Sequence, residues 1–230
     1  MAYYKQTHYT GEPSLSIPSA YLKEALHLLI LGTKRLREKY NFDVNEYENN
    51  ITRKLVAAMH AEQKASRKYI IRVDIFSGTL SDPTSSTQLS EIDIRFTWDN
   101  YTERYLAAEA KRLFGKGASL AGPYVEEGVM DFIDGKYSRG HNRGIVLGYI
   151  LLEPIGNAIT SVKKALENRR TKTNEIPPID KVQGCFNYSQ MYRSAHTQKV
   201  TGEKIILYHM FVDLATPAIS LILTLCLSKK

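Results

Sequence analysis

The sequence has little cysteine, and the cysteines it has are not spaced for a metal site or a disulfide framework. Cys185 and Cys226 stand far apart, which excludes the usual zinc spacings and is typical of proteins in a reducing compartment. The first residues, MAYYKQTHYTGEPS, lack the apolar stretch of a signal peptide, so we expect no export. A cytoplasmic location is therefore the prediction.

Two catalytic patterns are also missing. The glycine-rich segment FGKGASLAGP lacks the Gly-Lys-Ser/Thr ending of a phosphate-binding loop, so we expect a flexible connection there and no nucleoside triphosphate site. Ser194, His196 and His209 have no matching acid, which excludes a nucleophilic hydrolase. With Tyr192, they are interpreted as polar groups satisfied within a hairpin, and a polar cluster near a substrate is the alternative.

Positive charge is plentiful, and it is grouped along the chain. The formal net charge is +7 and the sequence pI is about 9.2, which favours a polyanionic partner. A basic group that ends a helix near Lys163 is equally explained as ordinary solvated surface. The residues predicted to contact nucleic acid are Arg67, Lys68, Lys136, Arg139 and Arg143.

Length and hydrophobic patterning predict one domain that spans residues 1–230 and belongs to the α/β (α+β) class. The 43% hydrophobic content is enough for one substantial core. Residues 105–111 and 144–152 are apolar on both faces, as central strands are. The expected helices cover 20–39, 44–65, 124–133 and 154–168, and the expected strands cover 69–76, 92–96, 105–111, 144–152 and a C-terminal hairpin, 186–198 with 203–214.

The stretch SEIDIRFTWDNYTERYLAAEAKRL, residues 90–113, places charged groups on two successive strands. In the first, Ile92 and Ile94 alternate with Asp93, so the apolar residues look into a core and the carboxylate stands on the other face. In the second, Glu109 and Lys111 share one face of a strand that is otherwise apolar. If the strands pair, two oxygen ligands for a divalent cation converge beside an ammonium; the alternative is a solvated edge hairpin.

The second helix adds a further carboxylate. Glu48 falls on the apolar stripe that Ile51 and Leu55 continue, whereas Glu46 lies on the polar side. A carboxylate that points inward needs a partner or a metal. Glu48 is therefore a candidate for the same site, with a boundary position in water as the alternative.

The order helix, three strands, helix, strand, with Asp93 and Glu109-Ala110-Lys111 on the second and third strands, resembles the PD-(D/E)XK, or restriction endonuclease-like, nuclease superfamily. The resemblance covers about residues 44–152 and implies a central mixed sheet flanked by helices, to which the chain adds an N-terminal helix and a C-terminal extension at about 175–230. The superfamily's leading proline is here Ile92. The segments YLAAEAKRL, YVEEGVMDFIDGKYSRG and GIVLGYIL also resemble small stand-alone bacterial nucleases, many of which act in defence against phage.

The resemblance implies a role for each candidate. Asp93, Glu109 and the Ala110 carbonyl would hold Mg²⁺, for which Mn²⁺ could substitute, and Glu48 matches a helix carboxylate of the same site. Lys111 would position or activate water, either as a base with a depressed pKa or as a charged group that stabilises the oxyanion. The sequence does not choose between these two roles.

The predicted function is thus a Mg²⁺-dependent endonuclease that cleaves DNA as an effector of bacterial anti-phage defence. The alternatives are a catalytically inactive module that binds nucleic acid or a partner protein, and a nuclease that cleaves RNA. A homo-oligomer or a partner defence protein is expected by analogy. The apolar run Leu214–Leu227 is interpreted as part of the body or of an oligomer interface and not as a membrane anchor, because a span needs roughly 20 residues.

Overall fold

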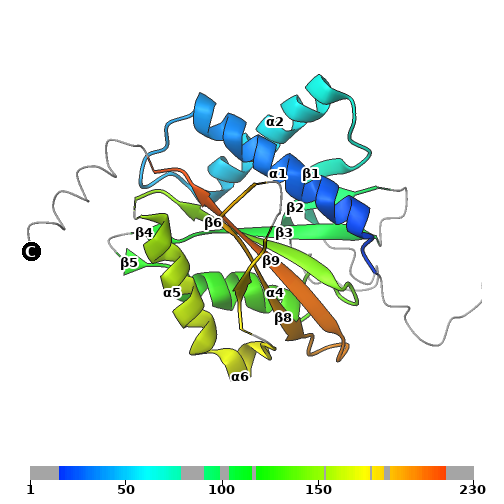
Figure 1. Ribbon diagram of the computed structural model, residues 1–230, viewed down its shortest axis with the longest axis vertical. Helices are drawn as coiled ribbons and strands as arrows, with labels where there is room; N and C mark the ends of the chain where they lie inside the picture. The colour runs from blue at the N-terminus through cyan, green and yellow to red at the C-terminus, as the bar shows by residue number, and fades with distance from the viewer. Residues whose placement is uncertain are drawn as a thin grey trace, which may run out of the picture.

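A seven-stranded mixed sheet forms the centre of the computed structural model, which describes residues 16–78, 91–98, 104–115, 118–152, 154–176, 178–183 and 187–215 (Figure 1). Helices cover both faces of this sheet, which confirms the predicted class. In spatial order the strands are β1 (Arg72–Gly78), β2 (Glu91–Thr97), β3 (Tyr105–Arg112), β6 (Arg143–Ile150), β9 (Lys204–Asp213), β8 (Met191–Thr197) and β7 (Asp180–Lys181).

Two hydrophobic cores lie on opposite faces of the sheet. Leu28 of α1 (Ser19–Lys39) and Leu55 of α2 (Glu48–Ser66) pack with Leu147 on one face. On the other face, Val129 and Val162 pack with neighbouring strand residues. The elements of this second layer are α3 (Ala121–Pro123), the π-helical segment η1 (Tyr124–Val129), α4 (Met130–Ile133) and α5 (Ile155–Glu167), with the short α6 (Arg170–Thr173) following α5.

The strands predicted to be central are interior strands. β6 pairs in parallel with β3 on one side and with β9 on the other, and the remaining pairs of the main sheet are antiparallel. From Gly144 to Ile150 every residue of β6 is buried. Helices on both faces explain this continuous apolar run, because no side of the strand meets water.

The second helix begins later than predicted. Residues 44–47 are not helical, because Asp43 closes a turn in which its side chain accepts the N–H of Asn45 at 2.8 Å and its carbonyl accepts the N–H of Glu46 at 3.0 Å. The helix then starts at Glu48, and its buried stripe includes Ile51 and Leu55, as predicted. The turn places Glu48 in the first helical turn, beside the sheet.

The C-terminal hairpin is an integral part of the main sheet. β9 pairs with β6 from Arg143 opposite Ile206 to Ile150 opposite Asp213, and β8 then pairs with β9. The expected flexible connection after Lys111 contains two short paired strands instead, β4 (Phe114–Gly115) and β5 (Ala118–Ser119). The prediction for that segment is wrong because turn-rich sequences also form short hairpins.

Some predicted features lie outside the described residues. They are both cysteines and all of the apolar C-terminal run beyond Ala215. In the part of the chain that the structure describes, no helix has the length and apolar character needed to cross a membrane.

Candidate active site

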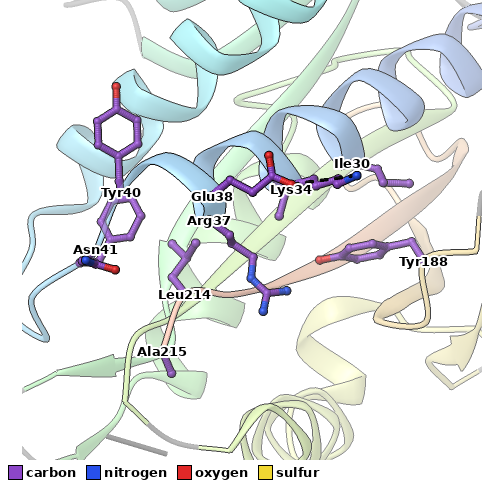
Figure 2. Close-up of a pocket in the computed structure, with 11 residues that line it drawn as sticks. Ile30, Lys34, Arg37, Glu38, Tyr40, Asn41, Tyr188, Leu214 and Ala215 are labelled. Carbon is purple, nitrogen blue, oxygen red and sulfur yellow. Dashed lines mark ion pairs between the residues drawn. The ribbon is translucent and has the colours of Figure 1, made fainter. Parts of the chain in front are cut away.

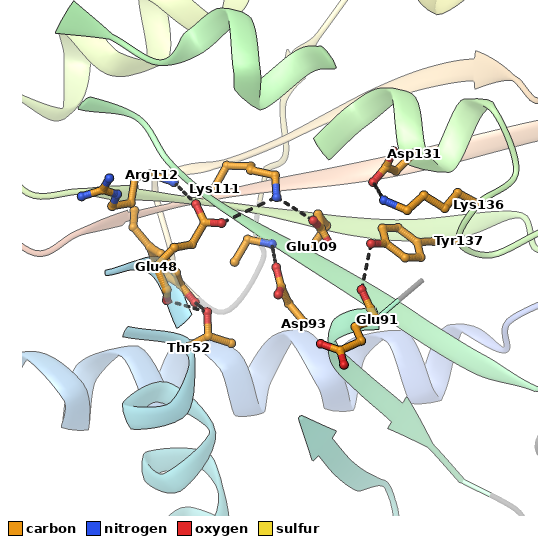
Figure 3. A network of polar contacts seen from close by, with 12 residues as sticks. Glu48, Thr52, Glu91, Asp93, Glu109, Lys111, Arg112, Asp131, Lys136 and Tyr137 are labelled. Carbon is orange, nitrogen blue, oxygen red and sulfur yellow. Dashed lines mark hydrogen bonds and ion pairs between the residues drawn. The ribbon is translucent and has the colours of Figure 1, made fainter. Parts of the chain in front are cut away.

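The backbone pairing between β2 and β3 stops at Ile94 and Ala108. Beyond this pair, the side chain of Asp93 takes the place of the β2 backbone as the partner of β3. The backbone N–H of Ala110 donates to Asp93 Oδ2 at 2.8 Å (Figure 3). A side chain thus satisfies a donor on the edge of β3 that a neighbouring strand would otherwise satisfy. The two strands separate at this point, and Asp93 is held against the backbone of β3.

The other neighbour of β2 is irregular at the same position. β1 pairs with β2 on both sides of Asp93, but Phe76, which would stand opposite Asp93, forms no pair with it. Phe76 has a φ of 49°, in the left-handed region that bulky residues rarely adopt. Ile94 packs below α1 and α2 whereas Ile92 packs in the opposite core, so the prediction that they share one face is wrong. Asp93 therefore lies at a break in the sheet, where the strand changes faces.

Glu48 caps the next free donor along the same edge of β3. Its Oε2 accepts the backbone N–H of Arg112 at 2.6 Å, and the Arg112 side chain donates to the Glu46 carbonyl at 3.1 Å. The Ala110 carbonyl faces the same edge, because the N–H and C=O of one strand residue point to the same neighbour. Two carboxylates and one backbone carbonyl consequently line the open edge of β3.

Glu109 and Lys111 lie next to these groups and bind each other. Lys111 Nζ is 2.7 Å from Glu109 Oε1 and 3.6 Å from Glu48 Oε1. The Glu109 side chain is only 6% exposed, and its Oε2 is buried with no hydrogen-bond partner. The predicted convergence of Asp93, Glu109, Lys111 and Glu48 is thus found (Figure 3).

The carboxylates of this cluster hold protons more tightly than usual. Burial, followed by the charge of Asp93, raises the pKa of Glu109 to about 8. Burial also raises the pKa of Asp93 and of Glu48, against the opposing effect of Lys111 and of the backbone N–H groups that they accept. The single ammonium of Lys111 therefore does not compensate the negative charge that three poorly solvated carboxylates would carry if all were ionised.

Of the two roles left open for Lys111, its surroundings favour the charged one. Burial by itself would lower the pKa of Lys111, but the nearby Glu109 and Glu48 carboxylates outweigh burial and raise it. The lysine is therefore a fixed ammonium at neutral pH.

The segment η1 confines the stem of Lys111. A Cβ placed on Gly128 would lie 3.3 Å from Val146 Cγ1 and 3.4 Å from Lys111 Cγ, so the helical segment passes close over β3 and β6 at this point. π-Helical turns inside helices are frequent at functional sites. Here the close approach restricts the directions in which the lysine can extend.

Three residues that follow η1 border the cluster, and the sequence did not indicate two of them as part of it. Asp131 Oδ2 lies 2.5 Å from Lys136 Nζ, and the charge of Asp131 contributes to the raised pKa of Glu109. Tyr137 donates its O–H to the Glu91 carbonyl at 2.8 Å, and its pKa is raised by burial and then by the Glu109 charge. Asp131 lies on α4, and a turn at Gly135, with φ of 73°, brings Tyr137 back to the site, so no periodic pattern in the sequence places these two residues at the cluster.

The five predicted nucleic-acid contacts do not form one surface. Arg143 donates to the Ile17 carbonyl at 2.6 Å, so it anchors the segment before α1. Lys136 is paired with Asp131, and Arg139 is exposed in the same turn. Arg67 and Lys68 are exposed beyond the C-terminus of α2, about 28 Å along the helix from Glu48. Of the five, Lys136 lies near the carboxylates, since its charge opposes the rise in the pKa of Asp93, and Arg139 follows it in the same turn.

Ser194, His196 and His209 form a buried chain of hydrogen bonds away from the carboxylates. Ser194 Oγ is 2.6 Å from His196 Nε2 and 2.7 Å from His209 Nε2. His209 Nδ1 is 2.9 Å from the Tyr124 hydroxyl, and His196 Nδ1 is 2.9 Å from the Thr173 carbonyl. This agrees with the interpretation that these groups are satisfied within the fold, although the partners extend beyond the hairpin.

The carboxylate cluster fits a hard divalent cation. The unpartnered Glu109 Oε2, the Asp93 carboxylate and the Ala110 carbonyl are oxygen donors of the type that Mg²⁺ prefers, and Mg²⁺ commonly takes few protein ligands and keeps several waters. Among the described residues, no group of three or more His, Cys, Asp or Glu side chains is arranged as a ready-made metal site. The fit is therefore to an ion that retains much of its water.

A pocket elsewhere in the structure is lined by different residues. It has a volume of about 460 Å³ and lies between the end of α1 and the end of β9 (Figure 2). Its acidic side chain, Glu38, lies 4.0 Å from Lys34, and none of the predicted catalytic residues contributes to it. The carboxylate cluster is the stronger candidate for chemistry.

Comparisons with known proteins add no information on this site. Searches against family models, curated proteins and solved structures found no match to the chain.

Proposed function

We propose that the protein is a metal-dependent nuclease that hydrolyses phosphodiester bonds of DNA in the cytoplasm, as an effector of anti-phage defence. The observation that carries the proposal is the buried Glu109 oxygen without a partner, beside Asp93 and Lys111 at a break in the sheet. Buried carboxylates that repel each other lower the stability of the fold, so their convergence needs a functional reason.

Each residue has a chemical task in this proposal. Asp93 and Glu109, with the Ala110 carbonyl, would hold the cation, and Glu48 orients the open edge of β3 through its bond to the Arg112 N–H. When bound, Mg²⁺ polarises a phosphoryl oxygen and lowers the pKa of a coordinated water. Lys111, fixed as an ammonium, offsets the negative charge that develops on the phosphoryl group during attack.

One observation favours a second function, a module that binds nucleic acid without cleaving it. Lys111 Nζ lies 2.7 Å from Glu109 Oε1, so the ammonium already neutralises the carboxylate that would bind the cation. In this alternative the cluster is a closed ion-pair network. A cation has to displace or share the Lys111 contact for the nuclease proposal to hold.

Incubation of supercoiled plasmid with Mg²⁺, Mn²⁺ or EDTA tests the two functions. The nuclease proposal expects nicked or linear DNA only with a divalent cation, and loss of cleavage with binding retained in Glu109→Gln. Glu126→Gln is the matched control, because Glu126 is an exposed carboxylate of η1 that pairs with Arg169, away from the cluster. DNA binding by the wild type without cleavage in any divalent cation supports the module; adding the products of neighbouring genes tests for an activating partner.

A further inference from the structure

A groove opens next to the carboxylate cluster, between the start of α2 and the start of α3. It has a volume of about 630 Å³, within the range of about 300–1,000 Å³ that is usual for small-ligand sites. Lys111 and Arg112 contribute to it from the end of β3, and Tyr47 contributes from the position before α2. The groove is therefore continuous with the proposed catalytic site through Lys111.

Tyr47 is exposed in a way that the fold does not explain. At 74% exposure it is the most exposed large hydrophobic residue in the described part of the chain, where its ring takes part in no hydrogen bond or ring contact. Its backbone is nevertheless fixed, because its carbonyl accepts the N–H of Asn50 at 3.0 Å and of Ile51 at 3.2 Å. The fixed backbone thus anchors a flat, apolar side chain at the rim of the groove, while its ring stays accessible to a ligand.

The charges along the groove divide it into two parts. Lys111 and Arg112 are cationic and lie at the end nearest the catalytic cluster, and the Arg112 bond to the Glu46 carbonyl keeps the guanidinium at the rim. Tyr47, Leu120 and Pro123 supply apolar surface. Two carboxylates also line the groove: Glu48 stands at the cationic end, 3.6 Å from Lys111 Nζ, and Glu127 lies on η1, where it disfavours a phosphate. A nucleotide would therefore place its phosphate toward Lys111 and its uncharged base toward Tyr47.

From this arrangement we infer that Tyr47 is a stacking platform for an unpaired base of the DNA strand that enters the site. This rests on the proposed function and specifies its substrate as single-stranded DNA or the frayed or flapped end of a duplex. The π-face of a base inside a duplex is covered by its neighbours, whereas the face of an unpaired base is free to stack on an aromatic ring. Tyr47 consequently selects for unpaired nucleotides without reading their sequence.

The test measures binding of the full-length protein to labelled oligonucleotides by fluorescence anisotropy in EDTA, so that cleavage plays no part. One probe is single-stranded, and the other is a blunt two-strand duplex that contains the same sequence. Tyr47→Ala is expected to weaken binding of the single strand by about tenfold to hundredfold and binding of the duplex by less than about twofold. Tyr47→Phe, which keeps the ring, should bind like the wild type.

Ile70→Ala is the matched control, because Ile70 is also an exposed apolar side chain, at 69%, but lies past the far end of α2. Equal losses for single strand and duplex in Tyr47→Ala, no loss at all, or a Tyr47→Phe protein as weak as Tyr47→Ala would overturn the inference. So would a wild type that binds no oligonucleotide.

The two proposals fail separately. Tyr47-dependent binding by a wild type that never cleaves DNA leaves the stacking site standing and removes the nuclease. If the wild type cleaves DNA with a divalent cation, and Tyr47→Ala binds oligonucleotides as tightly as the wild type, the nuclease proposal stands and the stacking site is removed.

Discussion

Two buried polar clusters lie on the same face of the sheet and in the same row, and they differ in one respect. Glu109 on β3 stands opposite Val146 on β6, which in turn stands opposite His209 on β9, so the two clusters are separated by roughly 10 Å of sheet. The histidine cluster is closed, with a partner for every nitrogen of His196 and His209. The carboxylate cluster leaves an oxygen of Glu109 without a partner.

The histidine cluster is fully satisfied because one carbonyl fixes the direction of every proton. The Thr173 carbonyl only accepts, so His196 Nδ1 carries the proton and His196 Nε2 accepts from the Ser194 hydroxyl. Ser194 then accepts from His209 Nε2, and His209 Nδ1 accepts from Tyr124. Burial lowers the pKa of His196 to about 4 and of His209 to about 3, so both rings are neutral at physiological pH.

The comparison teaches that burial of polar groups has two outcomes in this fold. A neutral, fully paired chain stabilises one arrangement of β8, β9 and η1, as satisfied polar networks do. A charged, partly unpaired cluster that borders an open groove costs stability and is free to bind. We therefore expect mutations in the first cluster to affect folding and mutations in the second to affect activity.

The largest expected effect is on cleavage. Asp93→Asn, Glu109→Gln and Lys111→Met should each lower plasmid nicking by at least about a hundredfold, because each removes a charge that cation binding or the transition state requires. Glu109→Gln should also unfold at the same or a higher temperature than the wild type, since it removes a carboxyl group whose ionised form is disfavoured by burial and by the Asp93 charge. Nicking rates and thermal unfolding of the same preparations measure both.

A folded Glu109→Gln protein that nicks at the wild-type rate would contradict the assignment of the site. A Glu109→Gln protein that is much less stable would instead place Glu109 with the structural groups, and the contrast between the clusters would disappear.

The second expected effect is on stability. Ser194→Ala leaves His196 and His209 each without one buried partner, which should cost about 2–4 kcal/mol and lower the unfolding temperature by roughly 5–15 °C. Arg193→Ala is the control on the neighbouring position, where an exposed pair with Asp180 contributes little. Calorimetry should separate the two variants, and equal unfolding temperatures would show that the hydroxyl is dispensable.

A third prediction concerns the pH dependence of stability in EDTA. The pKa values of His196 and His209 are depressed below 6.5 in the fold, so the unfolded state binds more protons and stability falls as the pH drops below about 6.5. The pKa of Glu109 is raised from 4.5 to about 8, so the folded state binds more protons between these values and stability falls as the pH rises through them.

Urea unfolding at pH 5, 6, 7 and 8 distinguishes these two slopes. Glu109→Gln should gain stability over the wild type progressively from pH 5 to 8, while its loss on the acid side stays the same. A constant difference across this range would mean that Glu109 is ionised throughout and that its burial has little effect.

The smallest expected effect is that of Asp131→Asn, a residue that borders the carboxylates without holding the β3 edge. The change removes a charge that disfavours ionised Glu109 and releases Lys136, so nicking should change by less than about tenfold, or about 1.4 kcal/mol. Steady-state nicking at several Mg²⁺ concentrations measures it. A loss as large as that of Asp93→Asn would make Asp131 a member of the catalytic set.

The sequence predicted the parts of the fold that follow from local patterns. Continuous apolar runs identified β3 and β6 as interior strands, and the apolar stripe of α2 oriented Glu48 inward. The C-terminal hairpin was also predicted, and β8 pairs with β9. The pairing of strands distant in the sequence was beyond its reach, because the insertion of β9 beside β6 depends on contacts between distant segments. The two-residue strands β4, β5 and β7 are too short to show a period.

The candidate site shows the same limit. Asp93, Glu109 and Lys111 could be placed together because alternation along strands fixes which side chains share a face. Tyr137 could not, since it reaches Glu109 through the turn at Gly135, and Asp131 could not, since it reaches Glu109 from the separate helix α4. The positive charge of a residue did not show whether it has a structural role or is free to contact nucleic acid. Arg143 donates to the Ile17 carbonyl, whereas Arg139 is exposed.

The position of β9 has a consequence for how the protein is made. This last described strand lies in the interior of the sheet, between β6 and β8, although it is synthesised after the other strands that the structure describes. Until β9 is synthesised, the nascent chain carries β6 with one open, wholly apolar edge, the kind of surface that pairs with other chains. The sheet therefore cannot be completed until β9 has left the ribosome, and chain termination before β9 should yield aggregates and no partly active fragment.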